Sequence, residues 1–143
     1  MTGKDICRAS EGCHKVGKDG LIRPYICPAG YPTIGYGRLL KTMDHPAITK
    51  EQAEAMFDVD WSKHEALAVK ASPILANDEK GRGAIGDFVF NLGAGNYQAS
   101  ALRRAVNAQD WQEAIYQIKR WVRGGGRVLP GLVIRRGLDA SLL

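Results

Sequence analysis

The sequence predicts an α+β fold, with a small lobe of short strands near the N-terminus and a larger helical lobe after it. Residues 12–38 contain six glycines and three prolines, a density that favours short strands joined by turns. From residue 49 onward, apolar residues recur at helical spacing. Because a crevice between two lobes is a natural binding site, we expect a cleft between them.

Length and charge set limits on the class of protein. A chain of 143 residues fits one domain, 1–143, and its 45% hydrophobic and 24% charged residues are ordinary for a globular protein. The net charge of +5 attracts polyanions such as nucleic acid, anionic lipid or envelope polymers, or simply keeps the protein dispersed. No basic helical stripe carries interleaved aromatic residues, so nucleic-acid binding is not expected. No run approaches the roughly 18 apolar residues of a membrane span, so we expect no stable membrane association.

The cysteines argue against a disulfide framework. Cys7, Cys13 and Cys27 are odd in number and show no paired spacing. A zinc site from these three with His14 would lack the usual Cys-x-x-Cys ligand pair, so we expect no metal. The first residues lack a basic segment followed by an apolar stretch of about 7–15 residues, as a secretion signal would have. We therefore expect folding in a reducing cytoplasm, with another protein needed to reach any substrate outside.

The N-terminal lobe should begin with a short helix over 4–11, where Ile6 and Cys7 offer a small apolar face. The strand candidates that follow are 21–22, 25–26 and 33–36.

The helical lobe should begin at Thr49, because Gln52 follows three residues later as in a capping box. Three tryptophans lie on apolar helical faces and are expected in the core. The later elements are a helix through 84–92 ended by Gly93, a helix over 101–106 capped by Ser100, a helix over 109–121, a flexible break at 124–126, and a helix starting at Pro130 and continuing through 131–142.

Glu11 is the first candidate for chemistry. Glycoside hydrolysis needs an acid to protonate the leaving oxygen and a second group to activate or position water. Glu11 lies where the predicted helix gives way to the glycine-rich segment, and partial burial there would favour its protonated form. Most carboxylates are surface residues, so position alone does not assign the role.

The motifs around Glu11 resemble those of the phage T4-type lysozymes, glycoside hydrolase family 24. Ser10-Glu11-Gly12 is followed by Tyr25, Cys27 and Thr33-Ile34-Gly35-Tyr36-Gly37, and similar segments continue at 49–54, 87–95 and 129–136. The resemblance therefore covers nearly the whole chain. It implies a lysozyme-like fold and a muramidase without cofactors. Its substrate would be the β-1,4 bond between N-acetylmuramic acid and N-acetylglucosamine of bacterial peptidoglycan, and its effect host-cell lysis.

The resemblance also implies roles for three catalytic residues. Glu11 would be the general acid, and the Thr33 hydroxyl would help to position the attacking water. Cys27 lies where the family has Asp or Cys. A thiol with an ordinary pKa near 8.5 is a weak base at neutral pH. Cys27 could hold water, act as a thiolate if its pKa is lowered, or be an inert core thiol.

Further resemblance implies substrate contacts at Gly35, Tyr36 and Asn91. Gly35 and Gly37 would let a sugar chain approach the backbone, although a tyrosine such as Tyr36 is more often a packing residue. The Asn91 amide could bind an N-acetyl group or peptide stem, or it could satisfy backbone groups at a helix end.

Arg135 and Arg136 are a further pair whose role the sequence leaves open. They could face the active-site carboxylate, bind peptide carboxylates, or form surface pairs.

The chain departs from the family pattern at two places. The spacing from Glu11 to Cys27 is longer than in the family, with 13–20 as an apparent insert. Asp19 in this insert could approach the cleft, but a turn aspartate beside Gly20 is favoured. Arg38 stands where the family usually has His, from which we expect altered contacts at the cleft rim without loss of activity.

The alternative function is a non-catalytic peptidoglycan-binding or structural protein that kept the fold. Such a protein would be expected to lose the acid first, and Glu11 is present. The resemblance favours an endolysin that acts as a monomer, accumulates in the host cytoplasm and reaches the cell wall after a holin permeabilises the membrane.

Overall fold

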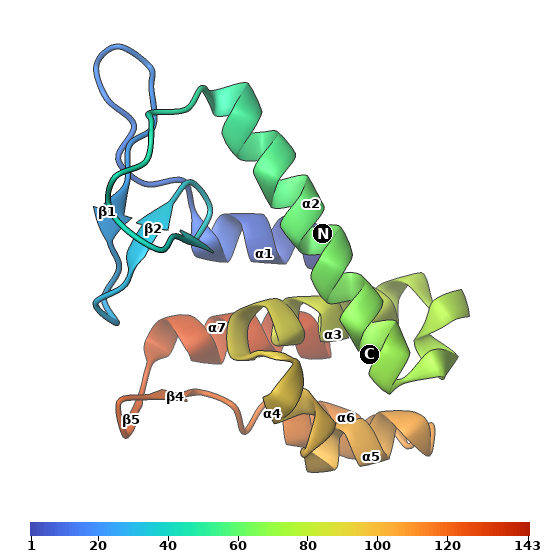
Figure 1. Cartoon of the computed structure of the whole chain (residues 1–143). Coiled ribbons are helices and arrows are strands. Elements are labelled where there is room, and N and C mark those ends of the chain that lie inside the picture. The colour runs from blue at the N-terminus through green and yellow to red at the C-terminus, as the bar shows by residue number, and fades with distance from the viewer. The chain divides into compact units, whose positions relative to one another are not determined.

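The computed structural model describes residues 1–143, which divide into two compact units. The smaller unit is Glu11–Ser62, and the larger unit combines Met1–Ser10 with Lys63–Leu143. Helix α2, Lys50–Ala71, continues from the smaller unit into the larger one. A three-stranded sheet belongs to the smaller unit and most helices belong to the larger, as the sequence predicted (Figure 1).

A three-stranded antiparallel sheet organises the smaller unit. Its strands are β1 (Tyr25–Ile26), β2 (Pro32–Ile34) and β3 (Arg38–Leu39), in the order β1-β2-β3. Strands at 25–26 and within 33–36 are confirmed. The second one ends at Ile34 because the backbone then turns through Gly35 at φ +63°. The predicted strand at 21–22 is reduced to isolated bridges from Ile22.

The start of α2 closes the core of the smaller unit. Gln52 N–H donates to Thr49 Oγ1 (3.1 Å), and Thr49 N–H donates to Gln52 Oε1 (2.8 Å), which confirms the predicted capping box. The first helical turns then present apolar side chains to the sheet. The buried core residues of this unit are Ile22, Ile34, Ile48 and Ala53.

Helices dominate the larger unit. Gly93 ends α3 (Glu79–Leu92), and the Ser100 hydroxyl caps α5 (Ala101–Asn107) by accepting from Arg103 N–H (3.0 Å), both as predicted. No helix is both long enough and apolar enough to cross a membrane. The elements outside the smaller unit's sheet and α2 are α1 (Gly3–Glu11), a 3₁₀ helix η1 (Pro73–Asn77), α3 (Glu79–Leu92), α4 (Ala94–Gln98), α5 (Ala101–Asn107), α6 (Trp111–Ile118), β4 (Arg123–Gly124), β5 (Arg127–Val128) and α7 (Pro130–Ala140).

Two predictions in this unit were wrong in detail. The helix expected over 109–121 is shorter, because Gln109 takes φ +56° and Asp110 caps the first turn by accepting from Glu113 N–H. The expected flexible break at 124–126 is a tight hairpin between β4 and β5. Gly125 and Gly126 both have positive φ, as a two-residue hairpin turn requires.

The core of the larger unit is built around Phe88 of α3, which is fully buried. The Trp121 ring packs edge-on against it, with ring centroids 5.3 Å apart. Trp111 is partly buried against the same core, and Trp61 in the smaller unit is 4% exposed. The expectation that the tryptophans serve packing is therefore confirmed.

Arg135 and Arg136 do not form surface pairs, contrary to one of our expectations. Both are buried in the interface of α7 with α3. The Arg135 guanidinium donates to both carboxylate oxygens of Asp87 at 2.7–3.2 Å. Arg136 lies 3.6 Å from Asp87 and 3.3 Å from Asp139, both fully buried. The cationic groups are drawn inward because the carboxylates they pair with are themselves buried.

Candidate active site

Glu11 is the last residue of α1 and the first residue of the smaller unit. The helix ends there because Gly12 takes φ +66°, a left-handed conformation that glycine adopts without steric cost. Glu11 is half-buried. It thus shares one compact unit with the other two predicted catalytic residues, Cys27 and Thr33.

The Glu11 carboxyl lies against the bare Cα of Gly37 in the turn between β2 and β3. A Cβ at Gly37 would stand 3.0 Å from Glu11 Oε2, closer than such atoms normally approach. Gly37 also has φ +88°, which side chains disfavour. The turn therefore depends on glycine both for its backbone conformation and for the room that it leaves to the carboxyl.

The inserted segment fastens the end of α1 to the sheet. His14 Nε2 lies 2.9 Å from the backbone oxygen of Glu11, to which it donates in the tautomer that carries the proton on Nε2. The His14 ring also contacts the Tyr25 ring, with centroids 5.1 Å apart. A residue that the sequence linked only to a zinc site thus bridges the Glu11 backbone and β1.

Asp19 is a turn residue of the insert, which was the favoured prediction. Its carboxylate accepts from Leu21 N–H (3.1 Å) and from both terminal nitrogens of Arg23. The hydrogen bond from Arg23, followed by that from Leu21 N–H, lowers the pKa of Asp19 to about 2. Asp19 is therefore an ionised turn residue paired with Arg23.

Tyr25, Cys27 and Thr33 share one face of the sheet. Tyr25 pairs directly with Thr33 across β1 and β2, and directly opposed residues point to the same side. Cys27 follows Tyr25 by two residues and so continues that face. Burial raises the pKa of Tyr25, and the negative charges of Glu11, Cys27 and Cys13 raise it further. Glu11 and Cys27 both lie within electrostatic reach of this tyrosine.

Cys27 is partly exposed at the mouth of a tight hairpin loop. Its N–H donates to Tyr31 O (3.0 Å), and its carbonyl accepts from Gly30 N–H (2.8 Å). The pKa of the Cys27 thiol is lowered, first by the backbone N–H of Tyr31, then by the Thr33 side chain and the backbone N–H groups of Ala29 and Gly30. Cys27 is therefore not a core thiol, and its part in the reaction stays a prediction. Burial instead raises the pKa of Cys13.

Thr33 is nearly buried, at 2% exposure. Its Oγ1 donates to Tyr31 O at 2.9 Å. The hydroxyl has a single proton, so it can donate either to Tyr31 O or to a Cys27 thiolate. The ionisation state of Cys27 and the orientation of the Thr33 hydroxyl are therefore coupled.

The chain is similar in sequence to known phage proteins. The Phage lysozyme family matches residues 17–138 of the chain. The chain belongs to the phage lysozyme family. The SAR-endolysin of Bacteriophage PS34 is 34% identical over 133 residues, covering 88% of this chain and 78% of that protein. The endolysin of Acyrthosiphon pisum secondary endosymbiont phage 1 is 33% identical, covering 85% of each chain.

Solved structures agree with this assignment. The endolysin from Escherichia coli O157:H7 phage FAHEc1 superimposes with a TM-score of 0.78 at 26% identity, covering 98% of this chain and 89% of that one. The chain is therefore a phage lysozyme with the lysozyme-like α+β fold, a peptidoglycan-hydrolysing glycosidase of the endolysin type. A non-catalytic role is not favoured.

Two predicted substrate residues of this lysozyme face α2 in the structure. The Tyr36 hydroxyl donates to Glu54 Oε1, and its ring packs against Phe57. Gly35 is buried, and a Cβ there would lie 3.6 Å from the Cβ of Ala53. The absence of a side chain at Gly35 thus lets α2 lie close to the backbone in the structure. Contact of either residue with a glycan stays a prediction.

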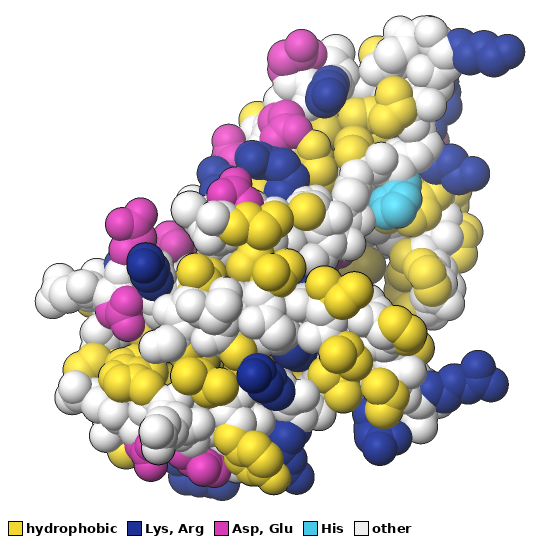
Figure 2. All heavy atoms as spheres, turned by 180° about the vertical axis from the view of Figure 1, so that it is seen from behind, with side chains coloured by type: hydrophobic (Ala, Val, Ile, Leu, Met, Phe, Trp, Pro, Cys, Tyr) yellow, Lys and Arg dark blue, Asp and Glu magenta, His cyan; other side chains and the backbone are white.

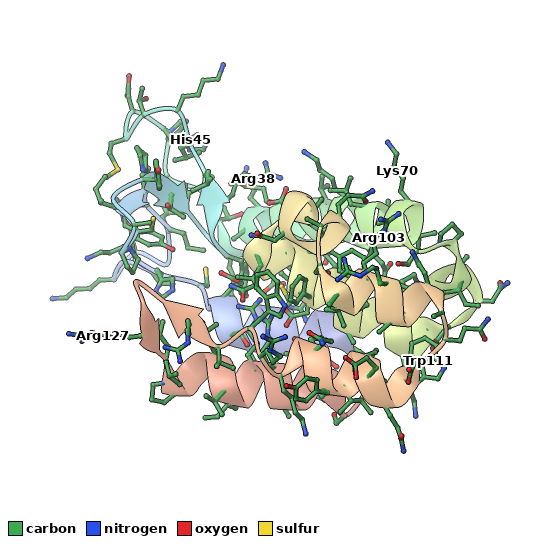
Figure 3. All side chains as sticks on the ribbon, turned by 90° about the horizontal axis from the view of Figure 1, so that it is seen from below. Arg38, His45, Lys70, Arg103, Trp111 and Arg127 are labelled. Atoms are coloured by element: carbon green, nitrogen blue, oxygen red, sulfur yellow. The ribbon has the colours of Figure 1, made fainter.

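Arg38 has a role that sequence reasoning missed. Its Nε and Nη2 donate to the two carboxylate oxygens of Asp60 (3.0 and 2.9 Å), and Nη2 also donates to Met56 O at 3.3 Å. Figure 3 shows Arg38 at β3, beside the helix that carries Asp60. This side chain fastens the hairpin to α2, and altered contacts at a cleft rim stay a prediction. No specific signal in the sequence points to this pairing, because any of the acidic residues of α2 could have been the partner of Arg38.

Asn91 lies in the larger unit, at the end of α3. Its Oδ1 accepts from Arg136 Nη2 at 3.0 Å, so neither of our alternatives describes the amide oxygen. Binding of substrate by its amide N–H₂ group stays a prediction.

Proposed function

We propose that this lysozyme hydrolyses the β-1,4 bond between N-acetylmuramic acid and N-acetylglucosamine, with Glu11 as acid and with Cys27 and Thr33 assisting the attacking water. The observation that carries the proposal is the placement of three groups in one compact unit. A helix-end carboxyl lies against Gly37, and a thiol with a lowered pKa lies beside a threonine hydroxyl in the same sheet. Such a pairing of a proton donor with a water-activating group is what glycoside hydrolysis requires.

In the proposed reaction, the Glu11 carboxylic acid gives its proton to the glycosidic oxygen as the bond to the sugar carbon breaks. A water attacks that carbon from the opposite face of the ring and loses a proton to the Cys27 thiolate. The backbone N–H groups around the sulfur stabilise the thiolate form. Thr33 donates to the sulfur or to Tyr31 O according to the charge of Cys27. Because water attacks directly, the sugar configuration is inverted.

Replacement of Glu11 by Gln tests the acid. Glutamine keeps the shape of the side chain but cannot deliver the proton, so lysis of bacteria with exposed peptidoglycan should slow by about 10²–10⁴-fold. The matched control is Glu51→Gln at an exposed position in the first turn of α2, which should lyse at the parent rate. If E11Q lyses as fast as the parent, Glu11 is not the acid.

The products test the bond and the stereochemistry. Digested peptidoglycan should carry new reducing muramic acid ends, and their first-formed anomer, followed by NMR, should be inverted. Anhydro-muramic ends would identify a lytic transglycosylase, and reducing glucosamine ends would place the cut at the other glycosidic bond.

The finer features of the biology stay predictions. We expect a monomer, which sedimentation of the purified protein can check. We also expect that the protein accumulates in the host cytoplasm and lyses cells after a holin permeabilises the membrane. Expression of the chain with and without a holin would test this requirement, and lysis in its absence would contradict it.

A further inference from the structure

The outer face of α7 is apolar, whereas its charged side chains point inward. Val133 and Ile134 are 48% and 66% exposed, although they occupy the middle of the helix. Surface helices ordinarily place charge outward and apolar residues inward. The inverted arrangement leaves an uncharged surface at helical spacing, here called the α7 face: Pro130, Val133, Ile134 and Gly137.

The α7 face continues into the chain that leads to it. Val128 of β5 is 50% exposed, and Leu129, the residue before the first turn of α7, is 39% exposed. Leu129 and Val133 lie one helical turn apart, because Val133 N–H donates to Leu129 O at 3.1 Å. Exposed apolar residues are normal when scattered, but a contiguous group indicates an interaction surface.

Cations border this surface. Arg123 and Arg127 extend from the β4–β5 hairpin, are exposed and take part in no ion pair. Residues 114–138 contain no Asp or Glu. Figure 3 shows Arg127 directed away from the hairpin, and Figure 2 shows hydrophobic side chains beside Lys and Arg side chains at this end of the larger unit, with no Asp or Glu among them.

We propose that the α7 face and the hairpin arginines dock this lysozyme reversibly on the surface of an anionic phospholipid bilayer. Val133 and Ile134 would enter the headgroup boundary, while Arg123 and Arg127 would pair with lipid phosphates. A second copy fits less well, because a two-fold contact through this face would bring the unpaired arginines of both copies together. The proposal revises our expectation of no stable membrane association, which considered spanning segments alone.

Vesicle co-sedimentation tests the proposal without any glycan. The whole protein should pellet with vesicles that contain phosphatidylglycerol, remain in solution with pure phosphatidylcholine vesicles, and detach as salt is added. The double change Val133→Ser with Ile134→Ser should lower the partition coefficient about tenfold, and Arg127→Glu should lower it at least about fivefold. Neither change touches the core, so thermal unfolding should confirm that both variants fold.

Matched controls test whether vesicle binding depends on this surface or on any exposed apolar or charged side chain. Val59→Ser removes a side chain that is 63% exposed on α2, and Lys18→Glu reverses an exposed charge in the insert. Both controls should bind vesicles like the parent. The proposal is overturned if the protein ignores anionic vesicles, if the controls lose binding as much as the α7-face variants, or if sedimentation shows a dimer that V133S/I134S dissociates. E11Q should bind vesicles normally, so failure of the catalytic assignment is distinguishable.

Discussion

At the scale of single residues, Gly37 lies directly against the carboxyl of the proposed acid, Glu11. Gly37→Ala would place a methyl group 3.0 Å from Glu11 Oε2. A displaced catalytic group is costly, so we expect turnover to fall by about tenfold or more. Lysis rate and thermal unfolding, measured together, check this.

Gly20→Ala is the matched control for Gly37→Ala. Gly20 also has positive φ, +78°, but a Cβ there would meet nothing within 4 Å. Both variants should lose about 1 kcal/mol of stability from the backbone conformation. Only the Gly37 variant should also lose lytic activity. Equal losses of lytic activity in both variants would show that the contact with Glu11 is unimportant.

Cys27 is the residue at which this chain's chemistry can be separated from that of an aspartate-bearing lysozyme. Cys27→Ala should lower kcat by about 10²-fold, whereas Cys27→Asp should retain activity because a carboxylate can also accept the water proton. Since the base must be ionised, activity of the parent should rise with pH toward the lowered thiol pKa. An aspartate is already ionised there, so the rise should move to lower pH in C27D.

The measurement for Cys27 is the pH profile of kcat/KM on purified peptidoglycan. Equal rates in the parent, the alanine variant and the aspartate variant would return Cys27 to a packing role. An unchanged profile in C27D would show that a different group is the base.

At the scale of elements, the candidate site depends on how the sheet is attached to α2. Arg38 on β3 bonds twice to Asp60 and once to Met56 O, and Tyr36 in the preceding turn bonds to Glu54. These contacts hold both ends of the turn that contains Gly37. Loss of either attachment would loosen the segment that lies against Glu11.

Arg38→Ala should lower the free energy of unfolding by about 1–2 kcal/mol. The pair is bidentate, but its side chains are 34% and 24% exposed, so solvent screening limits its contribution. Arg38→Lys should recover only part of the loss, because an ammonium cannot form the fork. A double-mutant cycle with Asp60→Asn measures the coupling by denaturant unfolding.

Arg23→Ala is the control for this pair. Arg23 pairs with Asp19 at similar distances but with about half of each side chain exposed, so its loss should hardly change stability. A stability loss in R23A as large as that in R38A would mean that the attachment of β3 to α2 is not special.

At the scale of the whole molecule, the buried cluster between α3 and α7 links stability to pH. Burial, followed by the neighbouring charge of Asp87, raises the pKa of Asp139 to about 9 against the opposing effect of Arg136. In the unfolded chain the ordinary value is 3.8. Between these values the folded protein keeps a proton that the unfolded chain releases. The free energy of unfolding therefore falls as pH rises through this window.

Asp139→Asn should remove this dependence. Asparagine cannot ionise and has nearly the same size and shape as the protonated acid. The variant should therefore gain stability relative to the parent as pH rises from about 4 to about 9, which denaturant unfolding at several pH values would reveal. A difference between the two proteins that does not change with pH would mean that Asp139 is ionised in the folded state.

Much of this protein follows from local sequence. The capping box at Thr49 and Gln52, the cap at Ser100, and the helix stop at Gly93 are set by groups within a few residues of each other. The candidates for the proposed site came from the resemblance to the phage lysozymes, whose motifs stand in the same order around Glu11. The sequence by itself therefore determined most of the elements, the family and the candidates for catalysis.

Only the tertiary structure decided which partners the charged groups take. Arg38 meets Asp60 across 22 positions, and Arg135 meets Asp87 across 48. Such pairings depend on how whole elements pack, and no local pattern reports them. The same applies to α7, whose arginines turn inward toward the buried Asp87 while Val133 and Ile134 are left outside. A buried charge is tolerated only beside an opposite one, and burying it there outweighs the usual preference for an apolar inner face.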